Sequence, residues 1–356
     1  MRHVVRAAAY VPSGVFEGRS VAALDEDSFT LAATAAERAW SGRREEPGPI
    51  LAHLLGDLPP AVEWGFASLL GREVVVSRGP NDATEFVRAL RELEGGTGGA
   101  ALLVAAELPE RGAATSSPRE PAPGAAAVAF LLEPTDVASP LPLGKPVAGR
   151  SALAAAFRVG EPGKAAPHGV TFVGDWEWTA DGGRPVTVSP RELSPGNGLD
   201  AVSEGAYVPR ARYVENLPSR WRFLAESCGA CHHTTFPARR ICRFCGRTDS
   251  LTPVDLPTDG GRVVAVTTVG AGGQPTEFDQ QVKTSGPYDV ALVELARGMR
   301  VTLQVTDTVP GTLRVGDHVH TFLRRLYPME GEWRYGRKAV PVPLASTART
   351  PSDPAA

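Results

Sequence analysis

The stretch CGACHHTTFPARRICRFCG, residues 228–246, decides how the chain folds, and it contains all four cysteines of the 356-residue sequence. Cys228, Cys231, Cys242 and Cys245 are spaced as C-x2-C, ten residues, then C-x2-C. Each pair favours a tight turn in which both thiolates point the same way, and two facing turns supply the four sulfurs of a tetrahedral Zn²⁺ site. Four cysteine ligands leave no coordination position open for water or substrate. The spacing therefore predicts one structural zinc ion rather than a catalytic one.

The alternatives to zinc are two disulfides or four reduced, inert thiols. Disulfides are typical of secreted proteins, but residues 1–16 contain no apolar core followed by a cleavage site. No stretch approaches the roughly 18 uninterrupted apolar residues that indicate a membrane span. We therefore expect a cytoplasmic protein with reduced cysteines. His232 and His233 lie between the cysteine pairs and could replace a ligand, although four sulfurs already complete the tetrahedron.

The overall charge argues against a polyanionic partner. The 37 Lys and Arg residues are outnumbered by 40 Asp and Glu, which gives a net charge of −3. No global basic field is available to recruit nucleic acid or a membrane surface, so neither partner is expected. Nearly all the cations are arginine, in a chain rich in Ala, Gly and Pro. Arginine-rich tracts therefore indicate composition more than a functional patch.

Residues 1–135 alternate apolar runs with amphipathic segments, the pattern of a sheet covered by helices. Helices are expected at 25–40, 60–71 and 81–96, the first opened by acidic residues where the helix dipole favours negative charge. Strands are expected in HVVRAAAYVP, REVVVS, GAALLVAAE and GAAAVAFLLEP. A further helix, residues 211–227, is expected to lead straight into the cysteine turns.

From Gly260 the hydrophobic pattern changes to period two. Five short strands are expected, at 261–269, 288–295, 300–307, 318–327 and 332–343. Five antiparallel strands in about 85 residues are the inventory of a small Greek-key barrel of the OB type. The tail has the composition of a disordered segment.

The expected fold class is multidomain, α/β followed by β, in five parts. They are an α/β half-domain (1–135), a partly ordered connector (136–210), a helix with the zinc ribbon (211–250), the OB-type barrel (251–345) and a disordered tail (346–356).

The C-terminal half resembles a family of acyl-CoA-associated proteins that join a rubredoxin-like zinc ribbon to an OB fold. The resemblance runs from Tyr213 to Pro343. It is carried by SRWRFLAES, by the ribbon with its FPAR segment, and by GGRVVAVTTV, PYDVALVEL, GMRVTLQVTD, LRVGDHV and YGRKAVPV. It implies that the chain pairs with a thiolase-superfamily enzyme. It also implies that the OB surface helps to hold a thioester of CoA or of a carrier protein's phosphopantetheine arm.

Residues 1–135 look like the first half of a thiolase-fold enzyme of the hydroxymethylglutaryl-CoA synthase or ketoacyl synthase type. The residues that carry this resemblance are AAYVP, DEDSFTLAATAAERA, NDATEFVRAL, GAALLVAAE and PGAAAVAFLLEP. Two departures matter. Pro80 stands about where the family's nucleophilic cysteine lies, at a helix start that can lower a thiol pKa. The second half, with the catalytic histidine, is missing, because residues 136–210 are too few to hold it. The resemblance therefore implies a degenerate half-domain whose apolar surface another chain could cover.

The candidate substrate-binding residues are cationic. Arg239 and Arg240 lie on the ribbon hairpin, where guanidinium groups could bind the phosphates of CoA or form a solvated face. Arg324, Arg325 and Lys338, on the last two expected strands, carry the same two interpretations.

No catalytic residues are expected. His168 and Asp175 lie near two tryptophans, but isolated residues of this kind are usually structural. Ser77 and the other serines considered, Ser68, Ser116 and Ser117, lack a G-x-S-x-G context. Phosphate-loop, dinucleotide-binding and HExxH motifs are also missing.

The sequence thus predicts an accessory subunit that pairs with a full-length thiolase-superfamily enzyme acting on acyl-CoA or carrier-bound thioesters. The reaction would be carbon–carbon bond formation or cleavage, or acyl transfer. One alternative is a self-sufficient acyl-CoA-processing enzyme whose site includes part of residues 136–210. The other is a zinc-ribbon and OB module that binds single-stranded nucleic acid, which the acidity of the chain disfavours.

Overall fold

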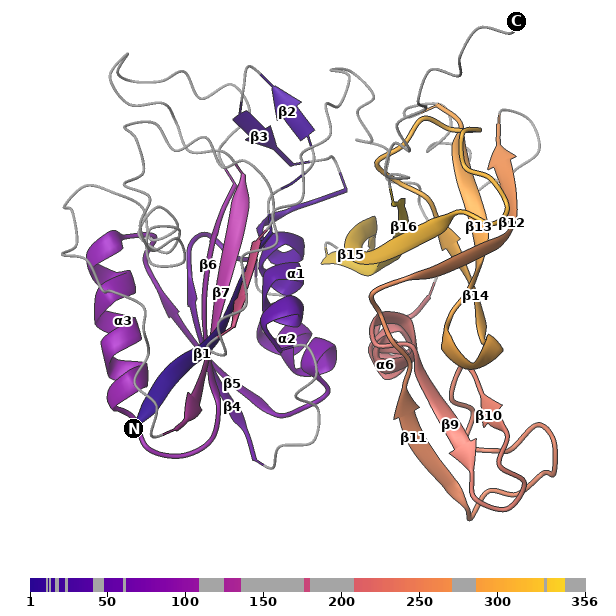
Figure 1. Cartoon of the computed structure of the whole chain (residues 1–356), viewed down its shortest axis with the longest axis horizontal. Coiled ribbons are helices and arrows are strands. Elements are labelled where there is room, and N and C mark those ends of the chain that lie inside the picture. The colour runs from indigo at the N-terminus through magenta and orange to yellow at the C-terminus, as the bar shows by residue number, and fades with distance from the viewer. Residues whose placement is uncertain are drawn as a thin grey trace, which may run out of the picture.

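The computed structural model describes residues 1–10, 12, 14–16, 19–22, 25–40, 48–59, 62–108, 125–135, 176–179, 208–270, 286–329 and 332–342. These residues form an α/β half around a six-stranded sheet and a β half with a three-stranded and a five-stranded sheet (Figure 1). The expected combination of α/β and β architecture is confirmed. The predicted tail, His168, Asp175 and nearly all of the predicted connector lie outside the described residues.

The six-stranded sheet is mixed, in the order β5-β4-β6-β7-β1-β8. β4 pairs in parallel with β5 and β6, whereas the β6–β7, β7–β1 and β1–β8 pairs are antiparallel. Its strands are β1 (Arg2–Tyr10), β4 (Ile50–Leu55), β5 (Val74–Gly79), β6 (Ala101–Glu107), β7 (Ala126–Pro134) and β8 (Trp176–Thr179). A separate two-stranded ribbon consists of β2 (Gly14–Phe16) and β3 (Arg19–Val21). β2, β3 and β4 are not among the strands expected from the sequence.

Helices cover both faces of this sheet (Figure 1). α1 (Ser28–Trp40) and α2 (Val62–Leu70) lie on one side, and α3 (Ala83–Gly95) lies on the other. Because successive strand residues point to opposite faces, alternate residues of one strand enter two different cores. On β7, one core takes Ala127, Ala129 and Leu131, and the other takes Ala126, Val128 and Phe130. Burial on both faces explains why β7 is apolar throughout its length.

The β half begins with two short helices, α5 (Arg210–Glu215) and α6 (Leu217–Trp221). The expected helix over 211–227 is wrong beyond α6. Phe223 has a positive φ of 53°, which ends helical geometry, and the chain then enters strand β9. The three-stranded sheet has the order β10-β9-β11 and consists of β9 (Leu224–Cys228), β10 (Thr234–Thr235) and β11 (Leu251–Asp255).

The five-stranded sheet is antiparallel, in the order β14-β13-β12-β15-β16. It consists of β12 (Gly261–Val269), β13 (Tyr288–Glu294), β14 (Arg300–Gln304), β15 (His318–Met329) and β16 (Glu332–Pro341), with a 3-10 turn, η2 (Ala296–Gly298), before β14. All five expected strands are present. One parallel bridge, Val305–Ala339, connects the chain just after β14 to β16. The sheet is otherwise open between these edges in the described residues, so the closed barrel stays a prediction.

The β half packs against α1 and α2, which lie between it and the six-stranded sheet (Figure 1). The ring of Phe29 on α1 lies 4.8 Å from that of Tyr335 on β16 and 6.0 Å from that of Trp221 on α6. The Tyr213 hydroxyl and the Trp221 indole both donate to the Tyr335 carbonyl, each at 3.0 Å. The expectation that another chain covers the apolar helical surface is therefore wrong for this face, because the same chain covers it.

Candidate functional site

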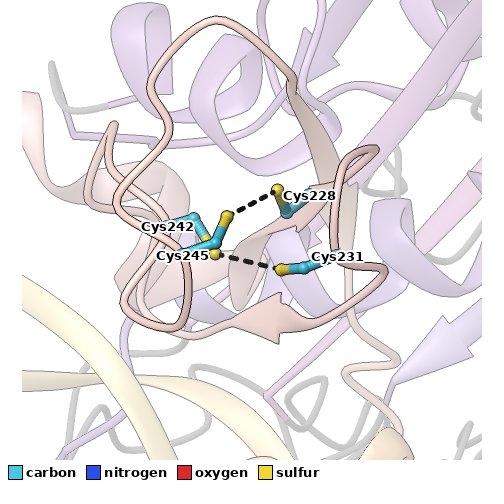
Figure 2. A group of neighbouring side chains, drawn as sticks. All are labelled: Cys228, Cys231, Cys242 and Cys245. Carbon is cyan, nitrogen blue, oxygen red and sulfur yellow. Dashed lines mark hydrogen bonds between the residues drawn. The ribbon is translucent and has the colours of Figure 1, made fainter.

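The four cysteines converge at one end of the β half. The Sγ atoms of Cys228 and Cys245 lie 3.6 Å apart, those of Cys231 and Cys242 lie 3.5 Å apart, and all four lie within 4.8 Å of one another. Figure 2 shows the four side chains pointing toward a common centre. The cysteines are free, so disulfides do not explain their proximity.

Two similar turns present the sulfurs. In the first, the His232 N–H donates to the Cys228 carbonyl at 2.8 Å, and in the second the Gly246 N–H donates to the Cys242 carbonyl at 2.8 Å. The fourth residue after the first cysteine has a positive φ in both turns, 60° at His232 and 73° at Gly246. Glycine adopts this conformation freely, whereas His232 adopts it at some conformational cost.

The segment between the two turns is fixed to the three-stranded sheet. Glu226 on β9 accepts the backbone N–H groups of Arg239 and Arg240, both at 2.8 Å. The His233 ring stacks on Phe244 with centroids 4.1 Å apart, which joins the two turns on their exposed side. These contacts place the second cysteine pair opposite the first.

The sulfur arrangement fits one tetrahedral metal ion. Metal–sulfur bonds of about 2.3 Å at the tetrahedral angle require sulfurs about 3.8 Å apart, close to the shortest observed separations. The Ser250 hydroxyl and the Cys231 backbone amide lower the pKa of Cys228 to about 6. A hydrogen bond from the His233 backbone amide lowers the pKa of Cys231, but burial and the neighbouring thiols outweigh it and raise that pKa to about 12. Four sulfurs this close do not all ionise without a cation, and a metal ion bound between them would supply that charge.

The five predicted substrate-binding cations do not form one site. Arg239 and Arg240 are exposed on the ribbon, and the Arg240 guanidinium lies 3.9 Å from Glu215. Arg325 is half-buried and its guanidinium lies over the Trp333 ring at 4.5 Å. Arg324 and Lys338 are buried between the two halves. A role of any of them in binding a thioester stays a prediction.

Arg324 and Lys338 belong to a buried ionic cluster that joins the halves. The Arg324 Nη2 lies 2.9 Å from Glu26 and 3.1 Å from Asp307, and it donates to the Tyr10 hydroxyl at 2.8 Å. The Lys338 ammonium donates to Asp25 at 2.8 Å. In the sequence, Asp25 and Glu26 resemble residues that favour a helix start, but that capping position belongs to Asp27, whose carboxylate accepts the Thr30 N–H at 2.9 Å.

In this ionic cluster the carboxylates of Asp25, Glu26 and Asp307 lie against the cations of Arg324 and Lys338. Burial, opposed by the Arg324 charge, raises the pKa of Glu26 to about 7. Burial also disfavours ionisation of Asp25, but Lys338 and Arg324 hold its pKa below the usual value.

The chain is similar to small scaffold proteins of archaea. It is 32% identical over 121 residues to a DUF35 domain-containing scaffold protein of Methanothermobacter thermautotrophicus, a match that covers 34% of this chain and 85% of the relative. The chain belongs to the DUF35 domain-containing scaffold proteins. A second relative, from Pyrococcus furiosus, is 30% identical over 135 residues, which are 37% of this chain and 92% of that protein. No family model matches the chain.

Solved structures similar to this DUF35 chain include the Ltp2-ChsH2(DUF35) aldolase, with a TM-score of 0.29, 22% identity, and coverage of 38% of this chain and 98% of that one. Another is β-ketoacyl-[acyl carrier protein] synthase III of Thermus thermophilus, with a TM-score of 0.32 and 17% identity. That match covers 37% of this chain and 51% of the synthase chain. Among the described residues, no helix combines the length and the apolar character needed to cross a membrane.

Replacing Cys242 by serine is expected to abolish metal binding and unfold the ribbon, because metal binding supplies roughly 10–16 kcal/mol of folding free energy in small zinc modules. Elemental analysis of the purified protein and hydrogen exchange of residues 224–255 measure both effects. The double variant His232→Ala/His233→Ala is the matched control and should keep one metal ion per chain. A Cys242→Ser protein with full metal content would contradict the assignment.

Arg324→Gln is expected to lower the free energy of unfolding by about 3–5 kcal/mol, because it leaves buried carboxylates without their cation. Arg325→Gln, at the next position on the same strand, should cost less because Arg325 is only half-buried. Urea denaturation of the metal-loaded proteins measures both. Equal stability of Arg324→Gln and the wild type would show that the cluster does not hold the halves together.

The pKa of Glu26 predicts a pH dependence of stability. Its folded-state pKa of about 7 lies above the ordinary 4.5, so its stabilising contribution is complete below about pH 4.5 and is lost as pH rises through 7. Glu26→Gln mimics the protonated side chain and should lack this loss. Urea midpoints of both proteins, measured with excess metal at pH 6 and 8, should therefore diverge in favour of the variant at pH 8. If the urea midpoints of both proteins changed equally between pH 6 and pH 8, a protonated Glu26 in the folded state would be contradicted.

Proposed function

We propose that this chain is a zinc-containing scaffold subunit that pairs with a complete thiolase-superfamily enzyme acting on acyl-CoA or carrier-bound thioesters. The observation that carries the proposal is the similarity to DUF35 scaffold proteins, which extends over 85% of the Methanothermobacter protein. The additional α/β half sets this chain apart from these smaller relatives. Its resemblance to the first half of a thiolase-fold enzyme suggests the class of partner.

The α/β half supports a division of labour in which the partner carries out the carbon–carbon or acyl-transfer chemistry. Pro80 lies between β5 and α3, where the resemblance places a nucleophilic cysteine. The first turn of α3 is capped by Asp82, whose carboxylate accepts the N–H groups of Thr84 and Glu85. An acidic cap occupies the positive end of the helix, where a thiolate would otherwise be stabilised. The four cysteines of the chain all lie in the candidate metal site.

Zinc is the metal we propose for the cysteine cluster. Four thiolates at tetrahedral spacing suit Zn²⁺, and the closed coordination gives the ion a structural role. Reduced thiolates fit a cytoplasmic location. In this proposal the ribbon fixes the orientation of the five-stranded sheet, an OB-type barrel that contacts the thioester arm. Arg239 and Arg240, exposed on the ribbon, are the cations best placed to meet its phosphates.

The test is reconstitution with the thiolase-superfamily enzyme encoded by the neighbouring reading frame. The two purified proteins should form a complex by size-exclusion chromatography with light scattering, and formation or cleavage of a carbon–carbon bond in the thioester substrate should require the partner. Cys242→Ser should abolish the complex, whereas Arg239→Ala/Arg240→Ala should keep it and raise KM for the thioester. Formation or cleavage of a carbon–carbon bond in an acyl-CoA substrate by this chain alone would defeat the proposal and favour a self-sufficient enzyme.

A further inference from the structure

A serine and a histidine meet on the α3-facing side of the six-stranded sheet. Parallel pairing of β4 with β5 places His53 beside Ser77, and the His53 Nδ1 lies 2.7 Å from the Ser77 Oγ. Ser77 is exposed, and its hydroxyl is therefore accessible to a molecule in solution. The His53 side chain is only 13% exposed, so the surrounding chain holds the imidazole in place.

A carboxylate lies on the other side of the same imidazole. The His53 Nε2 is buried and lies 3.4 Å from the Oε1 of Glu85, in the first turn of α3. Hydrogen bonds from Arg88 lower the pKa of Glu85, which keeps the carboxylate ionised. Gly79 makes this approach possible, because a Cβ at that position would lie only 2.9 Å from the Glu85 Oε1.

A hydroxyl, an imidazole and a carboxylate in this order have the roles of nucleophile, general base and orienting group. We propose that Ser77 and His53 form an acyl-accepting catalytic site, with Glu85 as its positioning residue, that takes activated esters or thioesters as substrates. This activity goes beyond the scaffold role and does not require the partner enzyme.

The proposed reaction has two balanced steps. The Ser77 Oγ attacks the carbonyl carbon while its proton passes to the His53 Nδ1, and the alcohol or thiol leaves with that proton as its bond to the acyl group breaks. Water then attacks the acyl-serine, giving one proton to His53, which returns it to the Ser77 oxygen as the carboxylic acid departs. No oxidant, reductant or metal takes part.

The surface beside the hydroxyl favours an apolar acyl group. Leu51 and Val75 precede His53 and Ser77 by two residues on the same strands, so the four side chains share one face of the sheet. Leu51 is 36% exposed and Val75 is 50% exposed. These two aliphatic side chains offer an acyl chain a contact surface next to the nucleophile.

The test uses the full-length, metal-loaded chain with a fluorophosphonate probe and p-nitrophenyl butyrate. Peptide mass spectrometry should find the probe on Ser77, and Ser77→Ala should abolish both labelling and hydrolysis. His53→Gln should slow both by about 100-fold or more, the usual contribution of a general base. Ser68→Ala is the matched control, since this serine donates within α2 to the Trp64 carbonyl, and it should label and hydrolyse like the wild type.

The positioning role of Glu85 has its own readout. Glu85→Gln should lower kcat for p-nitrophenyl butyrate and leave KM unchanged, because the amide no longer orients the imidazole as the carboxylate does. Glu92→Gln removes another carboxylate bound to Arg88 and should leave both kcat and KM unchanged. Circular dichroism and metal content verify that each variant is folded.

Labelling that persists in Ser77→Ala, or a wild-type protein that neither labels nor hydrolyses, would overturn the proposal. So would a His53→Gln protein with wild-type rates, because the 2.7 Å contact would then be only a hydrogen bond between neighbouring strands. These assays contain no partner enzyme, so their failure leaves complex formation with a thiolase-superfamily enzyme unaffected. Loss of that complex would likewise leave the Ser77 chemistry intact.

Discussion

The burial of Arg324 is the constraint on which the arrangement of the two halves depends. Its side chain is 0% exposed and contacts Tyr10 on β1, Glu26 before α1 and Asp307 after β14. A buried guanidinium requires nearby carboxylates, so the α/β half must present its acidic residues at this one position. The aromatic contacts of Phe29 with Trp221 and Tyr335 supply apolar burial beside it. The pairing of Arg324 with its carboxylates fixes the orientation of the two halves, and the aromatic contacts of Phe29 add stability to their interface.

The metal centre and the buried cluster stabilise different parts of the β half. Four thiolates hold the ribbon, where little apolar surface surrounds the turns and Phe244 is 51% exposed. A module with so small a core requires a metal ion to fold. The five-stranded sheet instead shares a core with Phe223, the residue before β9, and with Ala225 on β9. The ribbon is therefore connected to that sheet through a common core.

The sequence predicted the features set by local spacing and failed where tertiary contacts decide. The C-x2-C pairs predicted the candidate metal site. Period-two patterns predicted all five strands of the five-stranded sheet in the β half. β4 was missed because ILAHLL is short and mostly buried, with no clear alternation. The acidic residues at 25–27 suggested a helix cap, yet two of them pair with cations about 300 residues later in the chain. Such pairings leave no periodic signal in the sequence.

Contacts between residues far apart in the sequence also explain why no sequence motif surrounds Ser77. Sequence motifs for serine nucleophiles describe one local turn, whereas here His53 comes from the neighbouring strand and Glu85 from the following helix. The two faces of the six-stranded sheet also differ in access: the β half covers the helices on one face, while Ser77 and Val75 remain exposed on the other. Ser77 lies three residues before Pro80, the position where a thiolase-like enzyme would carry its cysteine. In the proposed site the nucleophile thus lies on the strand instead of the helix start, and His53 provides the activation that the helix dipole would give a thiol.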